Sequence, residues 1–122
     1  MSRRKELIRE YRERPRQMGI YQVRNTANGK ILVGASTDLP AILNRHRAGV
    51  RLGAHPNHGV REDLKAFGAD VFAFEVLDTL ALPDDQPDYD PTHDLRTLEA
   101  MWLEKLSPFG ERGYNGKAPK PA

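Results

Sequence analysis

The sequence contains no cysteine and no long run of apolar residues. Without cysteine, the chain can form neither a disulfide framework nor a metal site built from thiolates. No apolar stretch approaches the ~20 residues that a membrane-spanning helix requires. We therefore expect a soluble, cytoplasmic protein that makes no use of a membrane.

The chain as a whole has little excess of one sign of charge, but some of its segments have a large one. The net charge of +2 and the pI of about 9.0 are too modest to require a nucleic-acid partner by themselves. Residues 1–18, however, hold seven Arg or Lys against three Glu, whereas residues 78–94 hold six Asp and neither Arg nor Lys. The distribution of charge is therefore more informative than its sum.

The length of 122 residues, 39% of them hydrophobic, allows one domain with one modest core. Residues 1–17 are predicted to form a basic helical extension, because Ser2 can serve as an N-cap and Pro15 as a stop. A solvated charged segment is the alternative. The domain itself is predicted to cover residues 18–116, and residues 117–122 a flexible C-terminal tail.

Residues 18–36, MGIYQVRNTANGKILVGAS, are predicted to form a β-hairpin. Asn28-Gly29 is a strong signal for a type I′ turn, which needs positive φ at both central residues. Such a turn would pair Ala27 with Lys30. Counting outwards from this turn places four residues on one face of the hairpin: Tyr21, Val23, Leu32 and Gly34. Tyrosine 21 and position 32 are therefore expected to share a face.

Two helices are predicted after the hairpin. The first begins at Asp38, has Pro40 in its first turn and ends at Gly49. The second covers residues 58–67 and ends at Gly68. The apolar residues at helical spacing on its inward side are Val60, Leu64 and Phe67.

The alternation in residues 70–78, DVFAFEVLD, predicts a half-buried strand. Its inward residues are Phe72, Phe74 and Val76. The acidic, proline-rich residues 82–91 are predicted to form a loop. A last helix is expected to start with Asp90 as N-cap and Pro91 at its first position, and to end before Pro108.

A carboxylate falls within the apolar side of this last helix. Glu99 lies in a stripe of side chains at helical spacing. The other members of the stripe are Leu95, Leu98, Trp102, Leu103 and Leu106. A carboxylate in an apolar seam is costly unless it is paired, hydrogen-bonded, protonated or bound to a cation. This pattern alone leaves three interpretations of Glu99: a partner of an arginine, a residue at the rim of the core, or a metal ligand.

Five short elements occur in order along residues 18–116: GIYQVRNTANGK, VG at 33–34, NRH in a helix, LEAMWLEKL and a final GYN. Their order and spacing resemble those of the GIY-YIG endonuclease family. The resemblance implies a small α/β (α+β) domain in which helices flank a central antiparallel sheet. It also implies cutting of nucleic-acid phosphodiesters with one divalent ion, Mg²⁺ or Mn²⁺.

The resemblance assigns roles to individual residues. Tyr21 takes the place of the first motif tyrosine and His46 that of the histidine in the first long helix. Glu99 takes the place of the metal-binding glutamate, and carboxylate oxygen is a preferred ligand of Mg²⁺. Asn115, the terminal asparagine, is assigned to nucleic-acid binding. Tyr21 can serve as a base only if its surroundings shift its pKa from the ordinary value near ~10, and His46 can take or relay its proton.

Two positions depart from the family pattern. The second motif tyrosine falls at Leu32, and the catalytic arginine of the first helix falls at Ile42. Leucine has no hydroxyl to hold a water or a phosphate oxygen, and isoleucine cannot make the charge-assisted contact that stabilises a phosphoryl transition state. Arg45, one turn later on the helix, is the candidate replacement for the missing arginine.

Further basic residues occur on the same helix. Arg47 and Arg51 lie near its end, beside the expected cleft, and are candidates for contacts with phosphates. An ordinary soluble surface is the alternative. His55 and His58 in HPNH have a spacing seen in metal sites, but the intervening proline and the lack of cysteine favour a loop or a helix cap.

The sequence is compatible with two functional classes. The first is a metal-dependent endonuclease with a variant site, acting on DNA rather than RNA. The second is a catalytically degenerate domain that binds nucleic acid or a protein partner. Retention of Tyr21, His46 and Glu99 favours the first class, whereas Leu32 and Ile42 favour the second.

Overall fold

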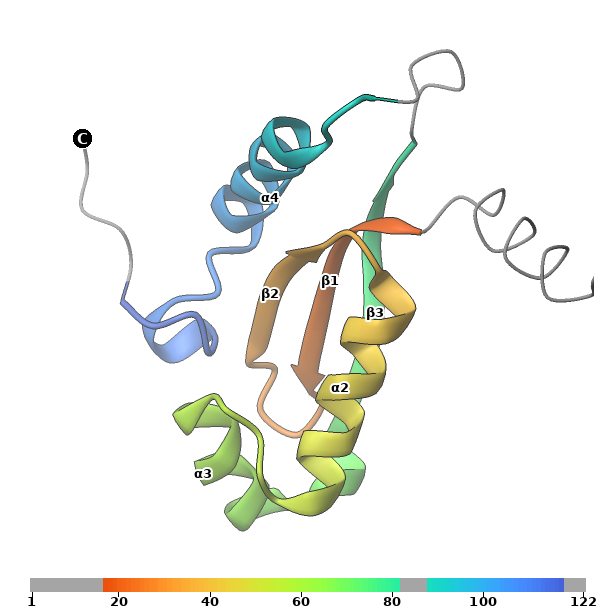
Figure 1. The fold of residues 1–122 in the computed structure, drawn as a ribbon. Coiled ribbons are helices and arrows are strands. Elements are labelled where there is room, and N and C mark those ends of the chain that lie inside the picture. The colour runs from red at the N-terminus through yellow and green to blue at the C-terminus, as the bar shows by residue number, and fades with distance from the viewer. Residues whose placement is uncertain (1–16, 82–87, 118–122) are drawn as a thin grey trace, which may run out of the picture.

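The computed structural model describes residues 17–81 and 88–117 (Figure 1). The predicted basic helix at the N-terminus, most of the acidic loop and the predicted C-terminal tail lie outside the described residues. The described residues thus cover the predicted domain, residues 18–116, except for part of its acidic loop.

A three-stranded antiparallel sheet forms the centre of the fold (Figure 1). Its strands are β1 (Met18–Asn25), β2 (Ile31–Ser36) and β3 (Phe72–Leu80), in the order β2-β1-β3. The helices are α2 (Leu39–Leu52), α3 (His58–Phe67) and α4 (Thr92–Leu106), with short 3₁₀ turns at Ala69–Val71 and Gly110–Arg112. Helix α2 contacts β1 and β3, whereas α4 contacts β1 and β2. The predicted α+β class, a central antiparallel sheet with flanking helices, is thus confirmed.

The connection between β1 and β2 differs from the predicted type I′ turn. Asn25 pairs with Lys30, so four residues rather than two form the loop, and only Gly29 has positive φ within it. The side chain of Asn25 accepts the N–H groups of Ala27 and Asn28, which holds the longer loop together. The pairing of Ala27 with Lys30 was therefore wrong.

The predicted common face of the hairpin is nevertheless correct. Tyr21 pairs with Gly34, and Val23 pairs with Leu32. The observed register differs from the predicted one by an even number of residues, and a side chain changes face only with an odd shift.

The first predicted helix starts as expected but ends later. Asp38 caps α2 by accepting the N–H of Ala41, and a proline lies in the first turn. Gly49 does not end the helix, which continues to Leu52 and is capped by Gly53 in the left-handed conformation. Gly49 is needed instead for close packing against His55.

Two residues predicted to face the core lie at its margins. Phe67 is 44% exposed at the last position of α3, and Val76 is 41% exposed on the edge strand β3. Val76 lies next to a bulge, at which the pairing of β3 with β1 shifts by one residue. The core predictions for these two residues were therefore wrong, although the helix and the strand were correct.

Helix α4 begins at Thr92, one residue later than predicted, and ends before Pro108. Asp90 still stabilises its start, because its carboxylate accepts the N–H of Thr92 at 3.0 Å and the hydroxyl at 2.6 Å. No helix among the described residues combines the length and the apolar character needed to cross a membrane.

Two apolar clusters hold the sheet to the helices. The larger joins β1 and β3 to α2, α3 and the C-terminal segment; its buried members are Val23, Val50, Val60, Phe72 and Tyr114. The smaller joins β1 to the start of α2; its buried members are Tyr21, Leu39 and Leu43. The tyrosine of the first motif, Tyr21, is therefore part of the core.

Candidate active site

The two glycines of the motif strands make room for other groups. A Cβ at Gly19 would collide with the backbone carbonyl of Asp78 on β3. A Cβ at Gly34 would lie 2.5 Å from Oη and 2.7 Å from Cζ of Tyr21. Ile20, which lies between Gly19 and Tyr21 on β1, is fully buried. The glycines thus allow β3 to approach β1 and allow the Tyr21 ring to lie over β2.

The hydroxyl of Tyr21 contacts a buried histidine of α2. Nε2 of His46 lies 3.0 Å from Oη of Tyr21, and the two ring centroids are 5.1 Å apart. Nδ1 of His46 lies 2.6 Å from Nε2 of His55, which is also buried. Tyr21 and His46, predicted as neighbours in one site, are therefore in contact.

His55 was assigned to a loop or a helix cap, and its Nδ1 does accept the N–H of Asn57 there. Its second contact, with His46, was missed. The loop between α2 and α3 folds back onto α2 and brings the two rings together with their centroids 4.9 Å apart. No local pattern announces this contact, because it depends on where the loop turns.

The electrostatics of these groups result from burial. Burial lowers the pKa of His46 to about 4, and the charge of Arg45, together with any protonation of His55, acts in the same direction. Burial also lowers the pKa of His55, as does Arg61. Both rings are therefore neutral at pH 7.

Glu99 acts on the same tyrosine. It is half-buried on α4, as the apolar stripe predicted. Burial raises the pKa of the Tyr21 phenol, and the negative charge of Glu99 raises it further. Glu99 and Tyr21 are therefore within electrostatic reach of each other, although they come from opposite ends of the chain.

The two altered positions are filled by packing. Leu32 is partly buried against the larger cluster, and Ile42 is partly buried beside Tyr21, Leu39 and Leu43 in the smaller one. The side chain of Ile42 thus packs against the cluster that contains Tyr21, and it supplies only apolar surface there.

The three arginines predicted to contact phosphates are not gathered in one place. Arg45 is exposed, and its charge acts on His46. Arg47 and Arg51 instead line a hollow of about 250 Å³ with Phe74 and other residues of the β3 side. The guanidinium of Arg47 lies 5.4 Å from the centroid of the Phe74 ring. On α2, Arg45 and Arg47 are about 200° apart, so they flank His46 on opposite sides.

Asn115 pins the C-terminal segment to the sheet. Its Oδ1 accepts the N–H of Val33 at 2.9 Å, and its Nδ2 donates to the carbonyl of Val33 at 2.8 Å. Val33 precedes Gly34, over which the Tyr21 ring lies. Asn115 therefore fixes the outer edge of β2 next to the tyrosine, and any nucleic-acid contact must use what remains of its hydrogen-bonding capacity.

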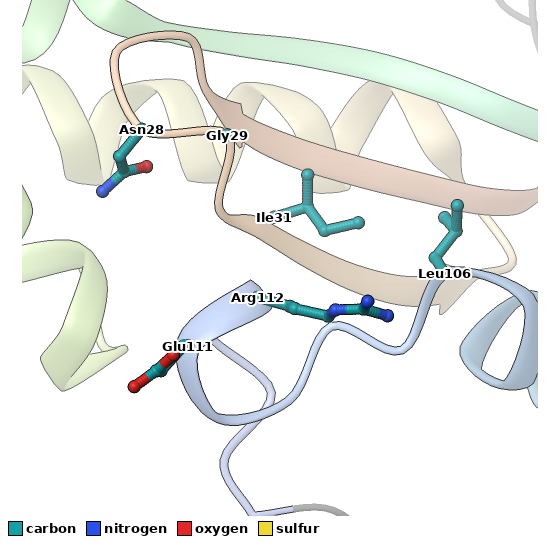
Figure 2. A pocket seen from close by; sticks show the side chains of 6 residues that line it. All are labelled: Asn28, Gly29, Ile31, Leu106, Glu111 and Arg112. Atoms are coloured by element: carbon teal, nitrogen blue, oxygen red, sulfur yellow. The ribbon is translucent and has the colours of Figure 1, made fainter.

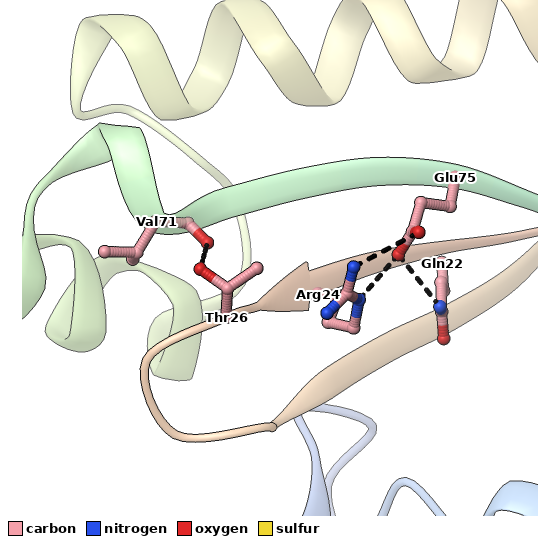
Figure 3. A network of polar contacts seen from close by, with 5 residues as sticks. All are labelled: Gln22, Arg24, Thr26, Val71 and Glu75. Carbon is pink, nitrogen blue, oxygen red and sulfur yellow. Dashed lines mark hydrogen bonds and ion pairs between the residues drawn. The ribbon is translucent and has the colours of Figure 1, made fainter.

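A second carboxylate near the sheet lies on its other face. Glu75 accepts hydrogen bonds from Gln22 and, at 2.7 and 3.3 Å, from Arg24 (Figure 3). The hydrogen bonds from Arg24 lower the pKa of Glu75. Gln22 and Arg24 alternate with Tyr21 and Val23 along β1, so this network faces away from His46.

A further hollow, of about 350 Å³, lies between the hairpin and the segment that follows α4 (Figure 2). Its lining residues are Asn28, Gly29, Ile31, Leu106, Glu111 and Arg112. It contains none of the predicted site residues, so the candidate site is defined by side-chain contacts and not by this hollow.

The chemistry of the donors permits a weakly held divalent ion at Glu99. Within residues 17–81 and 88–117, no three His, Cys, Asp or Glu side chains come together as a complete metal site. Mg²⁺, however, commonly binds through one or two carboxylates and keeps waters or substrate phosphates as its other ligands. A single half-buried carboxylate whose charge acts on Tyr21 fits that mode of binding.

Comparison with family models and with curated proteins gives no match. Among solved structures, the catalytic domain of the homing endonuclease I-TevI is 25% identical to this chain with a TM-score of 0.63, over 84% of this chain and 99% of that domain. A mutant form of the catalytic domain of the intron endonuclease I-TevI gives 24% identity and a TM-score of 0.64, over 86% and 99%. The fold of this chain is therefore that of an endonuclease catalytic domain.

Proposed function

Because this chain has the GIY-YIG domain fold that its sequence resembles, we propose that it is a DNA endonuclease that hydrolyses phosphodiesters with one Mg²⁺ or Mn²⁺ ion. One observation carries the proposal: the hydroxyl of Tyr21 is held at 3.0 Å from the buried His46 and lies within electrostatic reach of Glu99. A phenol held against a buried imidazole and influenced by a carboxylate is an arrangement that can transfer protons.

The nucleic-acid substrate is supported by charge and by the comparisons. The similar solved structures are catalytic domains of a homing endonuclease. In this chain, residues 1–18 carry an excess of basic residues, and Arg45, Arg47 and Arg51 are exposed along α2. Lys and Arg side chains supply the sequence-independent part of binding to phosphates. We infer DNA rather than RNA as the substrate.

The chain's own residues divide the work of hydrolysis between them. Glu99 would hold the cation, whose positive charge would offset this carboxylate and stabilise charge developing on the phosphate and the leaving oxygen. Tyr21 is the base that activates water. Because burial and the charge of Glu99 raise its pKa in the metal-free protein, this role requires that a bound cation bring the pKa of the phenol back down. His46 orients the phenol, and Arg45 contacts the phosphate in place of the arginine that Ile42 replaces.

A second candidate function rests on a different observation. Leu32 and Ile42 are partly buried against the apolar clusters, so the two altered positions supply packing and no polar group. This arrangement suits a catalytically degenerate domain that binds nucleic acid or a protein partner. The two candidates differ in whether the wild-type chain cuts DNA.

The experiment is a cleavage assay on single-stranded, branched and duplex DNA with Mg²⁺ or Mn²⁺. We expect wild type to cut at least one of them and Glu99→Gln to lose about 10²–10³-fold in rate, as when one preorganised charge-stabilising group is removed. Glu104→Gln is the matched control, because Glu104 is exposed on the same helix, and it should cut like wild type.

Calorimetry with Mn²⁺ separates metal binding from catalysis. We expect wild type and Glu104→Gln to bind the ion and Glu99→Gln to bind it much more weakly. Equal binding by all three proteins would remove Glu99 as the metal ligand. A folded wild type that binds DNA and cuts none of the substrates would leave the binding domain as the function.

A further inference from the structure

A chain of hydrogen bonds joins the backbone of Asn57 to the hydroxyl of Tyr21 through two buried histidines. The N–H of Asn57 donates to Nδ1 of His55 at 3.1 Å. Nε2 of His55 lies 2.6 Å from Nδ1 of His46, and Nε2 of His46 lies 3.0 Å from Oη of Tyr21. His55 is 1% exposed and His46 8%, so water does not compete for these contacts.

The backbone N–H of Asn57 fixes the donor and the acceptor of every hydrogen bond in this series. A neutral imidazole has one donor nitrogen and one acceptor nitrogen. Because the N–H of Asn57 can only donate, Nδ1 of His55 must accept, and the proton of His55 must sit on Nε2. Nε2 of His55 then donates to Nδ1 of His46, whose own proton must sit on Nε2. The opposite direction would place two N–H groups against each other between Asn57 and His55.

Two further contacts hold His55 where it can serve as this link. A Cβ at Gly49 would lie 3.2 Å from Cα and 3.4 Å from Cδ2 of His55, which is tighter than ordinary packing, so the absence of a side chain at Gly49 lets His55 lie against α2. The guanidinium of Arg61 donates to the backbone carbonyl of His55 at 2.8 Å. The loop is therefore fastened to both α2 and α3.

We propose that His55 is a positioning residue that fixes His46 as the Nε2–H tautomer, so that His46 donates to the oxygen of Tyr21. The hydroxyl proton of Tyr21 then points away from the histidines. In this arrangement His46 holds its own proton rather than taking that of Tyr21, and its N–H stabilises the phenolate form of the tyrosine. The consequence for catalysis rests on the proposed function, but the tautomer does not.

The test is a long-range ¹H–¹⁵N spectrum of the full-length protein near pH 7, without metal or nucleic acid. The two nitrogens of a histidine differ widely in ¹⁵N shift according to which one carries the proton. We expect His46 and His55 in wild type both to be protonated at Nε2 only. A wild-type spectrum with the proton of His46 on Nδ1 would overturn the proposal without any variant.

Variants of His55 then test whether this residue sets the tautomer. His55→Gln keeps an amide that can donate to Nδ1 of His46 and a carbonyl that can accept from Asn57, so His46 should stay in the Nε2–H form. His55→Phe has no donor, and His46 should become a mixture of tautomers. Should His55→Phe fail to fold, His55→Met fills the site without a donor and carries the same expectation. An unchanged tautomer of His46 in the variants that lack a donor would overturn the role of His55.

These spectra separate the inference from the proposed function. If wild type shows the expected tautomers and cuts no DNA, the positioning by His55 stands and the nuclease function fails. If wild type cuts DNA and His46 carries its proton on Nδ1, the function stands and the positioning fails.

Discussion

The candidate site consists of two parts that differ in how they are held. The polar part comprises Tyr21, His46 and His55, which are buried and joined by hydrogen bonds. The apolar part comprises Leu32 and Ile42, which occupy positions of a tyrosine and an arginine in the family pattern and pack against the two clusters. Hydrogen bonds hold the first part, and van der Waals contacts hold the second.

The difference shows which changes each part tolerates. Among the described residues, no buried side-chain nitrogen or oxygen lacks a hydrogen-bond partner. Removal of one member of the polar part would leave its neighbour unsatisfied, which costs about 1–3 kcal/mol. In the apolar part, Leu32 and Ile42 carry no polar side-chain group, so no hydrogen-bond donor or acceptor is left unsatisfied there. A substitution in the polar part therefore also affects the neighbour that it leaves unsatisfied, whereas a substitution in the apolar part acts mainly through its own packing.

The largest expected effect concerns the replacement of the lost arginine. If Arg45 now contacts the phosphate, Arg45→Ala should lower the rate of DNA cleavage by about 10²–10³-fold, since it removes one charge-stabilising donor. Arg47→Ala is the matched control, because Arg47 lies on the opposite flank of His46 and faces Phe74. We expect it to change cleavage only a few-fold. Equal losses in both variants would mean that the arginines act through general attraction to DNA.

An intermediate effect is expected from the pH dependence of the polar part. The unfolded chain protonates His46 below its ordinary pKa near ~6.5, whereas in the folded protein burial lowers this pKa to about 4. Between these values the unfolded state binds more protons, so the free energy of unfolding falls as the pH falls. The contribution of His46 to the free energy of unfolding is fully present above pH ~6.5 and is lost towards pH ~4. The free energy of unfolding changes by at most about 1.4 kcal/mol per pH unit through this residue.

Urea unfolding at several pH values between 7.5 and 5 measures this slope. His46→Gln should flatten it, and His58→Gln, at an exposed position at the start of α3, should leave it unchanged. The lowered pKa of His55 adds to the same trend, so some slope should remain in His46→Gln. Identical slopes in wild type and His46→Gln would show that burial of this ring does not govern stability in acid.

The sequence predicted those features that depend on neighbouring residues. Alternation predicted β3, and the capping signals at Asp38 and Gly68 matched helix ends. Glu99 could be singled out because a carboxylate is unexpected in an apolar stripe. In the structure this residue is half-buried. The common face of Tyr21 and Leu32 was also predictable, because strand alternation depends only on parity.

Features that depend on how the chain folds back on itself could not be predicted from the sequence. The Asn28-Gly29 signal failed because Asn25 organises the loop and is itself held by the hydroxyl of Tyr114, 89 residues away. Gly49 resembled a helix end, but its lack of a side chain serves the packing of His55. His55 was missed as a partner of His46 because their contact depends on where the loop between α2 and α3 turns.

The smallest expected effect lies where the polar part meets β2. In Gly34→Ala, the new Cβ would lie 2.5 Å from Oη and 2.7 Å from Cζ of Tyr21, so the ring must move and its 3.0 Å contact with His46 is disturbed. We expect the free energy of unfolding to fall by about 1–2 kcal/mol, as for other overpacked sites. In a Tyr21→Ala background the collision is absent, and the same substitution should cost little. Urea unfolding of the four proteins gives this coupling directly.

A second glycine of the hairpin supplies the control for this cycle. Gly29 has a φ of +81° and nothing within 4 Å of its ideal Cβ, so Gly29→Ala strains only the backbone. It should cost about 1 kcal/mol whether or not Tyr21 is present. If Gly34→Ala also costs the same in both backgrounds, Gly34 serves the strand and not the tyrosine. A coupling confined to Gly34 would instead show that the glycine of the second motif is retained for the position of the Tyr21 ring, even though the tyrosine of that motif has become Leu32.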